Sequence, residues 1–220
     1  MSFTKSQLLH SLKLCLVTQQ PDGSLEKYAA EKYAAIVCDA VRGGVTSVQL
    51  RYKGNDLATF FHLGIAIKDV LTRLSIPLIV NDNVLLAKAI DAEGVHLGAM
   101  DTSPLEARSI LGASKVIGLT VDTFDALEAA NQLDCIDYVG IGAIFNTATK
   151  TCRTVWGIEH LKKAVLLSRH PGVASGGIDE DNIGSVYATG VSGIAVISAI
   201  YNASDPAEAA RMLIYKMAGA

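Results

Sequence analysis

Short apolar runs rich in valine, isoleucine and leucine recur along the whole chain at nearly regular intervals. Continuous apolar runs of this length are typical of strands that are buried on both faces of a sheet. The pattern predicts eight strands, at residues 14–18, 47–51, 77–80, 94–97, 115–119, 138–141, 172–175 and 193–197.

The segments between these runs carry apolar residues at helical spacing and few clusters of β-branched residues. Pro104 and Pro206 suit the first turn of a helix, with Ser103 and Asp205 before them as N-caps. The predicted helices are 25–42, 57–74, 84–92, 104–111, 123–133, 158–168, 183–188 and 206–217, and residues 1–12 are expected to form a capping helix.

Regular alternation of strands and helices predicts a parallel α/β fold. The 220 residues give about 27 residues for each strand–helix unit, which is compact for a (β/α)8 barrel of typically about 250 residues. We predict a compact (β/α)8 TIM barrel with an N-terminal capping helix, and an open doubly wound sheet is the alternative. Because no linker, low-complexity tract or charge block interrupts the pattern, residues 1–220 are expected to form a single domain.

The composition indicates a chain with a large core. Half of the residues are hydrophobic and 19% are charged, and the mean hydropathy is +0.33, which excludes a disordered chain. The formal net charge of −3 argues against a nucleic-acid partner. All apolar stretches are far shorter than a spanning helix, so no membrane partner is expected. The sequence is compatible with a homo-oligomer.

Four cysteines are scattered along the chain without a metal-binding or disulfide spacing. Reduced thiols are the simplest interpretation, and they favour a cytoplasmic location. The four are Cys15, Cys38, Cys135 and Cys152.

Polar residues follow most of the predicted strands, at the end of a barrel where catalytic residues lie. Each group alone has a plainer explanation: Asn81, Asp82 and Asp101 could belong to turns or helix caps, and His96 is expected to be a packed histidine. The prediction of a site therefore rests on the collection, because one rim gathers all of these groups.

Together the rim residues suggest phosphate chemistry. Arg51, Lys53 and Lys150 supply three cations for an anion. Asp82 and Asp101 supply hard oxygen ligands, and magnesium is usually held by one or two carboxylates together with substrate phosphates.

A second phosphate site is expected after the last two strands. Gly176 and Gly177 allow backbone N–H groups to approach an oxyanion, and Ser198 begins a short segment that can present a helix N-terminus. The rim thus predicts two small phosphorylated substrates.

These residues lie in segments that resemble the thiamine-phosphate synthase family: QLRYK at 49–53, ND at 81–82, GVHLGAMD at 94–101, DYVGIGAIFNTATK at 137–150, GGI at 176–178 and GIAVISAI at 193–200. The resemblance implies a compact (β/α)8 barrel that joins hydroxymethylpyrimidine diphosphate to hydroxyethylthiazole phosphate. Thiamine phosphate and pyrophosphate are the products that it implies.

The resemblance also assigns roles to individual positions. It implies one Mg²⁺ per subunit at Asp82 and Asp101, and catalytic roles for Arg51, Lys53, Thr120 and Lys150. The implied pyrimidine diphosphate site comprises Gln49, Leu50, Arg51, Tyr52, Lys53, Asn81, Thr120 and Lys150. The implied thiazole phosphate site comprises Thr147, Ala148, Thr149, Gly177, Ile197 and Ser198.

The implied reaction is a dissociative substitution. Magnesium and the cations stabilise charge on the departing pyrophosphate, the aminopyrimidine delocalises the methylene cation, and the thiazole nitrogen attacks it. Positioning of the two substrates supplies much of the remaining acceleration, and no protein nucleophile is needed.

The chain departs from the family pattern in several places without losing a charged group. These departures leave room for an altered substrate preference or a slower enzyme. They are Gln19 after Thr18, Ala99 after HLG, Thr120 for a serine, Ala143 and Asn146 for prolines, and Ser175 for an apolar residue.

Three other functions remain open from the sequence. A related thiazole tautomerase usually lacks the two metal-site aspartates that this chain has. A Schiff-base aldolase could use Lys150, but it leaves both aspartates unexplained. A non-catalytic phosphate-binding relative is the third.

Overall fold

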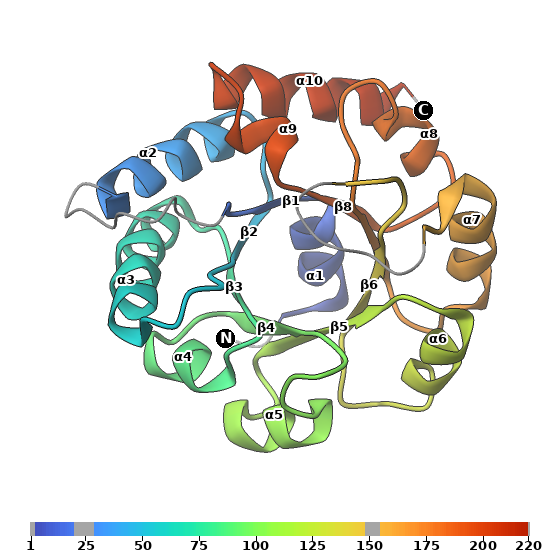
Figure 1. The fold of residues 1–220 in the computed structure, drawn as a ribbon, viewed down its shortest axis with the longest axis horizontal. Coiled ribbons are helices and arrows are strands. Elements are labelled where there is room, and N and C mark those ends of the chain that lie inside the picture. Colours follow the sequence, from blue (N-terminus) through green and yellow to red (C-terminus); the bar gives the residue numbers. More distant parts are fainter. Residues whose placement is uncertain (1–2, 20–28, 148–154, 220) are drawn as a thin grey trace.

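The computed structural model describes residues 3–19, 29–147 and 155–219, and its strands form one closed parallel barrel (Figure 1). Strand β1 pairs with β2 on one side and with β8 on the other, which closes the sheet. The predicted TIM barrel is therefore confirmed, and the open sheet is excluded. The strands are β1 Leu14–Val17, β2 Ser47–Leu50, β3 Leu78–Asn81, β4 Gly94–Leu97, β5 Val116–Val121, β6 Tyr138–Gly142, β7 Gly172–Ser175 and β8 Gly193–Val196.

The helices that follow the strands form a ring around the barrel (Figure 1). The predicted caps are present: the side chain of Ser103 accepts from Glu106 N, and that of Asp205 accepts from Glu208 N. The ring consists of α2 Ala29–Arg42, α3 Leu57–Leu74, α4 Val84–Ala89, α5 Pro104–Leu111, α6 Phe124–Ala130, α7 Gly157–Leu167, α8 Ile183–Tyr187, α9 Ser198–Tyr201 and α10 Pro206–Ala218. None of the helices in the described ranges has the length and apolar character needed to cross a membrane.

Alternate strand residues face two different environments. In β1, Leu14 and Leu16 are fully buried in the main core between strands and helices, whereas Cys15 and Val17 line a cavity inside the barrel. This is the two-residue period of an extended strand. The main hydrophobic core thus lies outside the barrel wall, and the inside holds a smaller apolar cluster together with polar residues.

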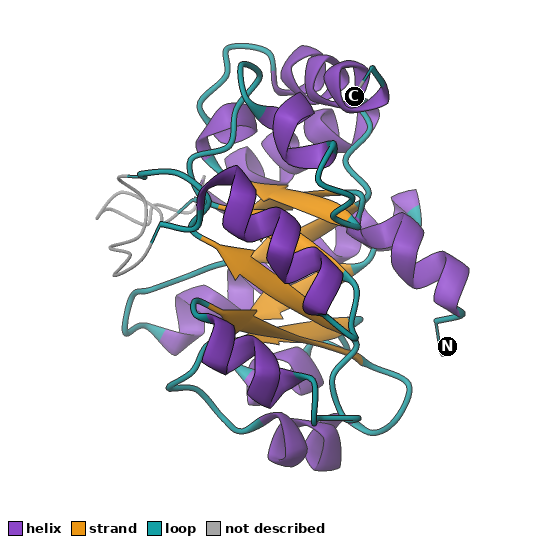
Figure 2. Cartoon of the chain, turned by 90° about the vertical axis from the view of Figure 1, so that its right-hand side faces the viewer, coloured by secondary structure: helices purple, strands orange, loops and turns teal. Residues whose placement is uncertain are grey.

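Helix α1, Lys5–Leu12, closes the barrel at the N-terminal ends of the strands. It begins with a capping box in which Gln7 N donates to Thr4 Oγ1 and Thr4 N donates to the Gln7 side chain. Figure 2 shows α1 at one end of the barrel, outside the ring of helices. Leu12 packs against barrel-interior residues that include Ile79, Val116, Tyr138 and Val173, so the predicted capping helix is confirmed.

Candidate active site

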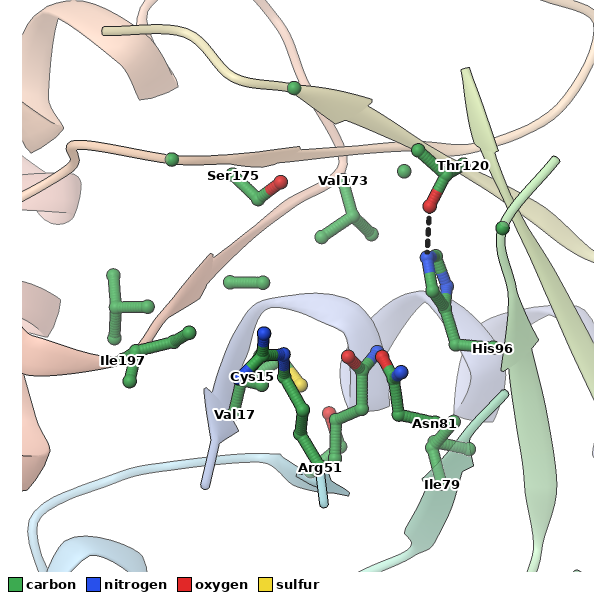
Figure 3. Close-up of a pocket in the computed structure, with 18 of the residues that line it drawn as sticks. Cys15, Val17, Arg51, Ile79, Asn81, His96, Thr120, Val173, Ser175 and Ile197 are labelled. Atoms are coloured by element: carbon green, nitrogen blue, oxygen red, sulfur yellow. Dashed lines mark hydrogen bonds between the residues drawn. The ribbon is translucent and has the colours of Figure 1, made fainter. Parts of the chain in front are cut away.

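A cavity of about 480 Å³ extends from the C-terminal rim into the barrel (Figure 3). Its volume falls within the range of about 300–1,000 Å³ that is usual for small-molecule sites. The structure brings most of the predicted site residues together in its lining: Gln49, Arg51, Lys53, Asn81, Asp82, Asp101, Thr120, Thr147, Gly177, Ile197 and Ser198. Three further predicted residues, Ala148, Thr149 and Lys150, lie outside the described residues.

The side chains of the predicted QLRYK segment, in β2 and the residues after it, point to two different faces of the barrel wall. Gln49, Arg51 and Lys53 line the cavity. Leu50 is fully buried in the hydrophobic core, and the ring of Tyr52 packs against Phe60 with centroids 5.3 Å apart. The side chains of Leu50 and Tyr52 therefore point away from the cavity, so their predicted binding roles would have to come from backbone groups.

Arg51 is held at the rim by a buried threonine of the neighbouring strand end. Thr18 is fully buried, and its Oγ1 accepts a hydrogen bond of 2.9 Å from Arg51 N and donates one of 3.3 Å to Arg51 O. This reciprocal pair fixes the backbone from which the guanidinium extends into the cavity (Figure 3).

The two predicted metal ligands lie side by side. Asp82 follows β3 in the left-handed backbone region, with a φ of 67°, and its backbone N donates to His96 O over 2.8 Å. The Oδ2 atom of Asp101 accepts a hydrogen bond of 2.7 Å from Gly98 N. Each carboxylate is thus placed by its own turn at the end of β3 or β4.

Burial raises the pKa of Asp101, and the hydrogen bond and negative charge of Asp82 raise it further, against the lowering effect of Gly98 N. Lys53 forms an ion pair with Asp82. Two adjacent carboxylates, with Asp82 disfavouring the charged form of Asp101, suit a divalent cation. No cluster of three or more His, Cys, Asp or Glu side chains that could hold a metal occurs in the described ranges. The pair therefore fits magnesium that takes its other ligands from phosphate and water.

The opposite side of the cavity is formed by two loops in close contact. Gly176 and Gly177 have φ values of 94° and 68°, a region that favours glycine. A Cβ on Gly177 would lie 2.7 Å from Asn146 O, and Phe145 N donates to Gly176 O over 3.0 Å. The glycine turn after β7 thus packs against the loop that leads to Thr147, so residues predicted to form the second phosphate site lie on two neighbouring loops.

The sequence prediction gave no role in the site to His96 and Tyr138, which both line the cavity. His96 is packed against the Tyr138 ring, as expected of a packed histidine, and it also lines the cavity with its Nε2 atom 2.8 Å from Thr120 Oγ1 (Figure 3). Its Nδ1 atom lies 2.9 Å from the Tyr138 hydroxyl. Gly118 and Gly140, inside the next two strands, were the available signal, because glycine within a strand often marks a close approach.

Comparisons with known proteins agree along nearly the whole chain. The model of the thiamine monophosphate synthase family matches residues 14–200. The chain is 43% identical to the thiamine-phosphate synthase of Vibrio campbellii over 94% of this chain and 98% of that protein. It is also 43% identical to that of Chlamydia abortus over 91% and 92% of the respective chains. The solved thiamine phosphate pyrophosphorylase from Pyrococcus furiosus superposes with a TM-score of 0.83 at 33% identity, covering 96% of this chain and 98% of that one.

Proposed function

The chain belongs to the thiamine monophosphate synthase family, and on that premise we propose that it joins hydroxymethylpyrimidine diphosphate to hydroxyethylthiazole phosphate. The observation that carries this proposal is that one cavity holds an acidic pair, two rim cations and a separate glycine turn. Such a cavity has the groups to bind a metal-dependent diphosphate on one side and a monophosphate on the other. We propose that residues 1–220 act as one domain, since all eight strands belong to the same barrel.

The pyrimidine diphosphate is assigned to the side formed by β2 to β5. Arg51 and Lys53, together with Lys150 from outside the described residues, bind the diphosphate as cations. Gln49, Asn81 and Thr120 provide hydrogen-bonding groups for the pyrimidine. Gln49 and Asn81 are largely buried, with exposed fractions of 8% and 9%, which suits contacts with a ring that enters the barrel.

Asp82 and Asp101 would hold one Mg²⁺. When bound there with the diphosphate, the ion supplies electrostatic neutralisation of the leaving group. Lys53 already pairs with Asp82, so a diphosphate oxygen that approaches the acidic pair also meets an ammonium group.

The thiazole phosphate is assigned to the opposite side. Gly177 and Ser198 offer backbone and hydroxyl donors to the phosphate, and Thr147 adds a hydroxyl from the facing loop. Ile197 lies at the same wall and provides apolar contact for the thiazole ring. Ala148 and Thr149 complete the proposed set from outside the described residues.

The proposed reaction breaks one bond and forms one bond, and it needs no covalent intermediate with the enzyme. The C–O bond between the pyrimidine methylene and the diphosphate breaks, and its electron pair leaves with pyrophosphate. The lone pair of the thiazole nitrogen then forms the new C–N bond. Cys15 lines the cavity, but burial raises its pKa to about 11, so it remains a thiol and is unsuited to act as a nucleophile.

The direct test measures pyrophosphate release from the pyrimidine diphosphate with and without the thiazole phosphate, in Mg²⁺ or in EDTA. We expect release that requires both the second substrate and the metal, together with stoichiometric thiamine phosphate. Folded protein that gives no product under any of these conditions would refute the proposal.

A further inference from the structure

A buried chain of hydrogen bonds connects two of the proposed pyrimidine contacts. Gln49 hydrogen-bonds the phenol of Tyr138, the phenol bonds His96 Nδ1, and His96 Nε2 bonds Thr120 Oγ1. Gln49 and Thr120 both line the cavity. The two residues between them, His96 and Tyr138, have no part in the reaction proposed above.

The barrel is shaped to hold these two rings. A Cβ on Gly140 would lie 2.7 Å from His96 Cε1, and a Cβ on Gly118 would overlap the phenol of Tyr138. The two rings also contact each other, with centroids 5.5 Å apart. Both strand positions are glycines, and a side chain at either would collide with the imidazole or the phenol. The two rings therefore occupy a defined position rather than a loosely packed space.

The direction of each hydrogen bond follows from the proton on Tyr138. Burial raises the pKa of Tyr138 well above its usual value, so the phenol keeps its proton, while the Gln49 side chain acts in the opposite sense. The amide N–H of Gln49 is a suitable donor to the phenol oxygen. The phenol O–H can then donate to His96 Nδ1, which lies 2.9 Å away.

A neutral imidazole that accepts at Nδ1 carries its proton on Nε2. In this tautomer, Nε2–H of His96 is the donor to Thr120 Oγ1, which lies 2.8 Å away (Figure 3). The hydroxyl proton of Thr120 is not used in this bond and is available to an acceptor in the cavity that Thr120 lines. Hydrogen bonds in such a chain polarise one another, which strengthens the last donor.

We propose that His96 and Tyr138 are positioning residues that fix the Thr120 hydroxyl as a hydrogen-bond donor to an acceptor atom of the pyrimidine diphosphate. This inference rests on the proposed function for its substrate. The tautomer of His96 is a property of the protein alone, and it can be measured without turnover.

The first experiment is a long-range ¹H–¹⁵N NMR correlation on protein labelled at histidine. The His96 signals are those absent from His96→Gln among the five histidines of the chain. We expect a neutral ring protonated at Nε2, and loss of this fixed state in Tyr138→Phe. A ring protonated at Nδ1, or at both nitrogens, would overturn the proposal whatever the activity of the enzyme.

The second experiment is a double-mutant cycle with Tyr138→Phe and Thr120→Val. Tyr138→Phe should lower kcat about tenfold, the equivalent of one well-formed hydrogen bond, and leave the KM for the thiazole phosphate unchanged. The double variant should be no slower than Thr120→Val alone, because both changes act through the same hydroxyl. Additive losses would contradict the proposed relay.

Tyr215→Phe is the matched control, because this tyrosine is 75% exposed and should keep full activity. If the unaltered protein forms no thiamine phosphate, the proposed function fails, and calorimetry of pyrimidine diphosphate binding replaces the kinetic arm. Thr120→Val and Tyr138→Phe should then weaken binding equally, and unchanged affinity in both would refute the inference.

Discussion

Replacing Gly177 by alanine separates the two proposed substrate sites. An alanine at this position is destabilising for two reasons. The backbone φ of 68° costs about 1–2 kcal/mol for a residue with a Cβ. In addition, the Cβ would lie 2.7 Å from Asn146 O and 2.8 Å from Phe145 Cβ. The second cost can be relieved only if the facing loop, which leads to Thr147, moves away. Both proposed sources of thiazole phosphate contacts are then displaced.

The size of the effect follows from the contacts at stake. Loss of one hydrogen bond to a charged phosphate is worth about 1.5–3 kcal/mol, or roughly 10- to 160-fold in affinity. We expect the KM for the thiazole phosphate to rise within this range, and the KM for the pyrimidine diphosphate to change less than about twofold. Initial-rate kinetics with each substrate varied in turn provide the measurement.

Gly190→Ala is the control for backbone strain. Gly190 has a φ of 85° with only Val165 Cγ1 near its would-be Cβ, at 3.9 Å, and it precedes β8 at the opposite end of the barrel. Both variants should lose the stability that the positive φ costs, about 1–2 kcal/mol in urea unfolding, and Gly177→Ala should lose more because of its close contacts. Only Gly177→Ala should change a KM. Equal increases for the two substrates, or the same kinetic change in Gly190→Ala, would refute the assignment of separate sites.

Three further predictions concern the rim and the barrel interior. Asp82→Asn and Asp101→Asn should each reduce kcat by about a hundredfold or more, because the proposed metal site loses the charge of a ligand. Their thermal unfolding midpoints should stay close to that of the unaltered protein. Unfolded variants would instead indicate that the two residues act as structural caps. Thr18→Val should cost about 1–3 kcal/mol in urea unfolding, because the part-buried Arg51 N–H loses its hydrogen-bond partner. It should also raise the KM for the pyrimidine diphosphate, and unchanged stability would contradict the role given to the Thr18–Arg51 hydrogen bonds. Burial raises the Cys15 pKa to about 11, so its thiol should stay protonated at pH 8. It should resist a disulfide reagent in the native protein and react with it in denaturant. Rapid labelling of the native protein, detected by peptide mass spectrometry, would contradict this burial.

The barrel was predictable because each of its strands lies in a short segment rich in apolar residues between helical segments. The predicted ranges 94–97 and 172–175 coincide with β4 and β7, and the predicted helix 57–74 coincides with α3. Strand β5 extends to Val121, beyond the predicted 115–119, because the polar Thr120 continues the strand while facing the cavity. Hydrophobicity alone could not find that end, since the inward face of a barrel rim is polar.

The sequence was enough to predict which charged residues belong to the candidate site, but not which side chains point into the cavity. A motif such as QLRYK names five consecutive residues, and only a known strand register separates the inward Gln49 from the buried Leu50. The hydrogen bond between His96 and Tyr138 could not be predicted for a different reason. It joins β4 to β6 across a sequence separation of 42 residues, and the sequence around either residue gives no sign of the other.

The barrel places its stability and its chemistry in different layers. The fully buried aliphatic side chains lie between strands and helices, while α1 closes the far end with Leu12. The residues proposed to bind substrate lie inside the wall and at its rim, where they contribute little to that aliphatic layer. Rim substitutions that keep the backbone conformation should therefore change kinetics without unfolding the protein. Gly177 and Thr18 are exceptions, because their roles are in the backbone of the rim itself, and their replacement should affect both stability and substrate binding.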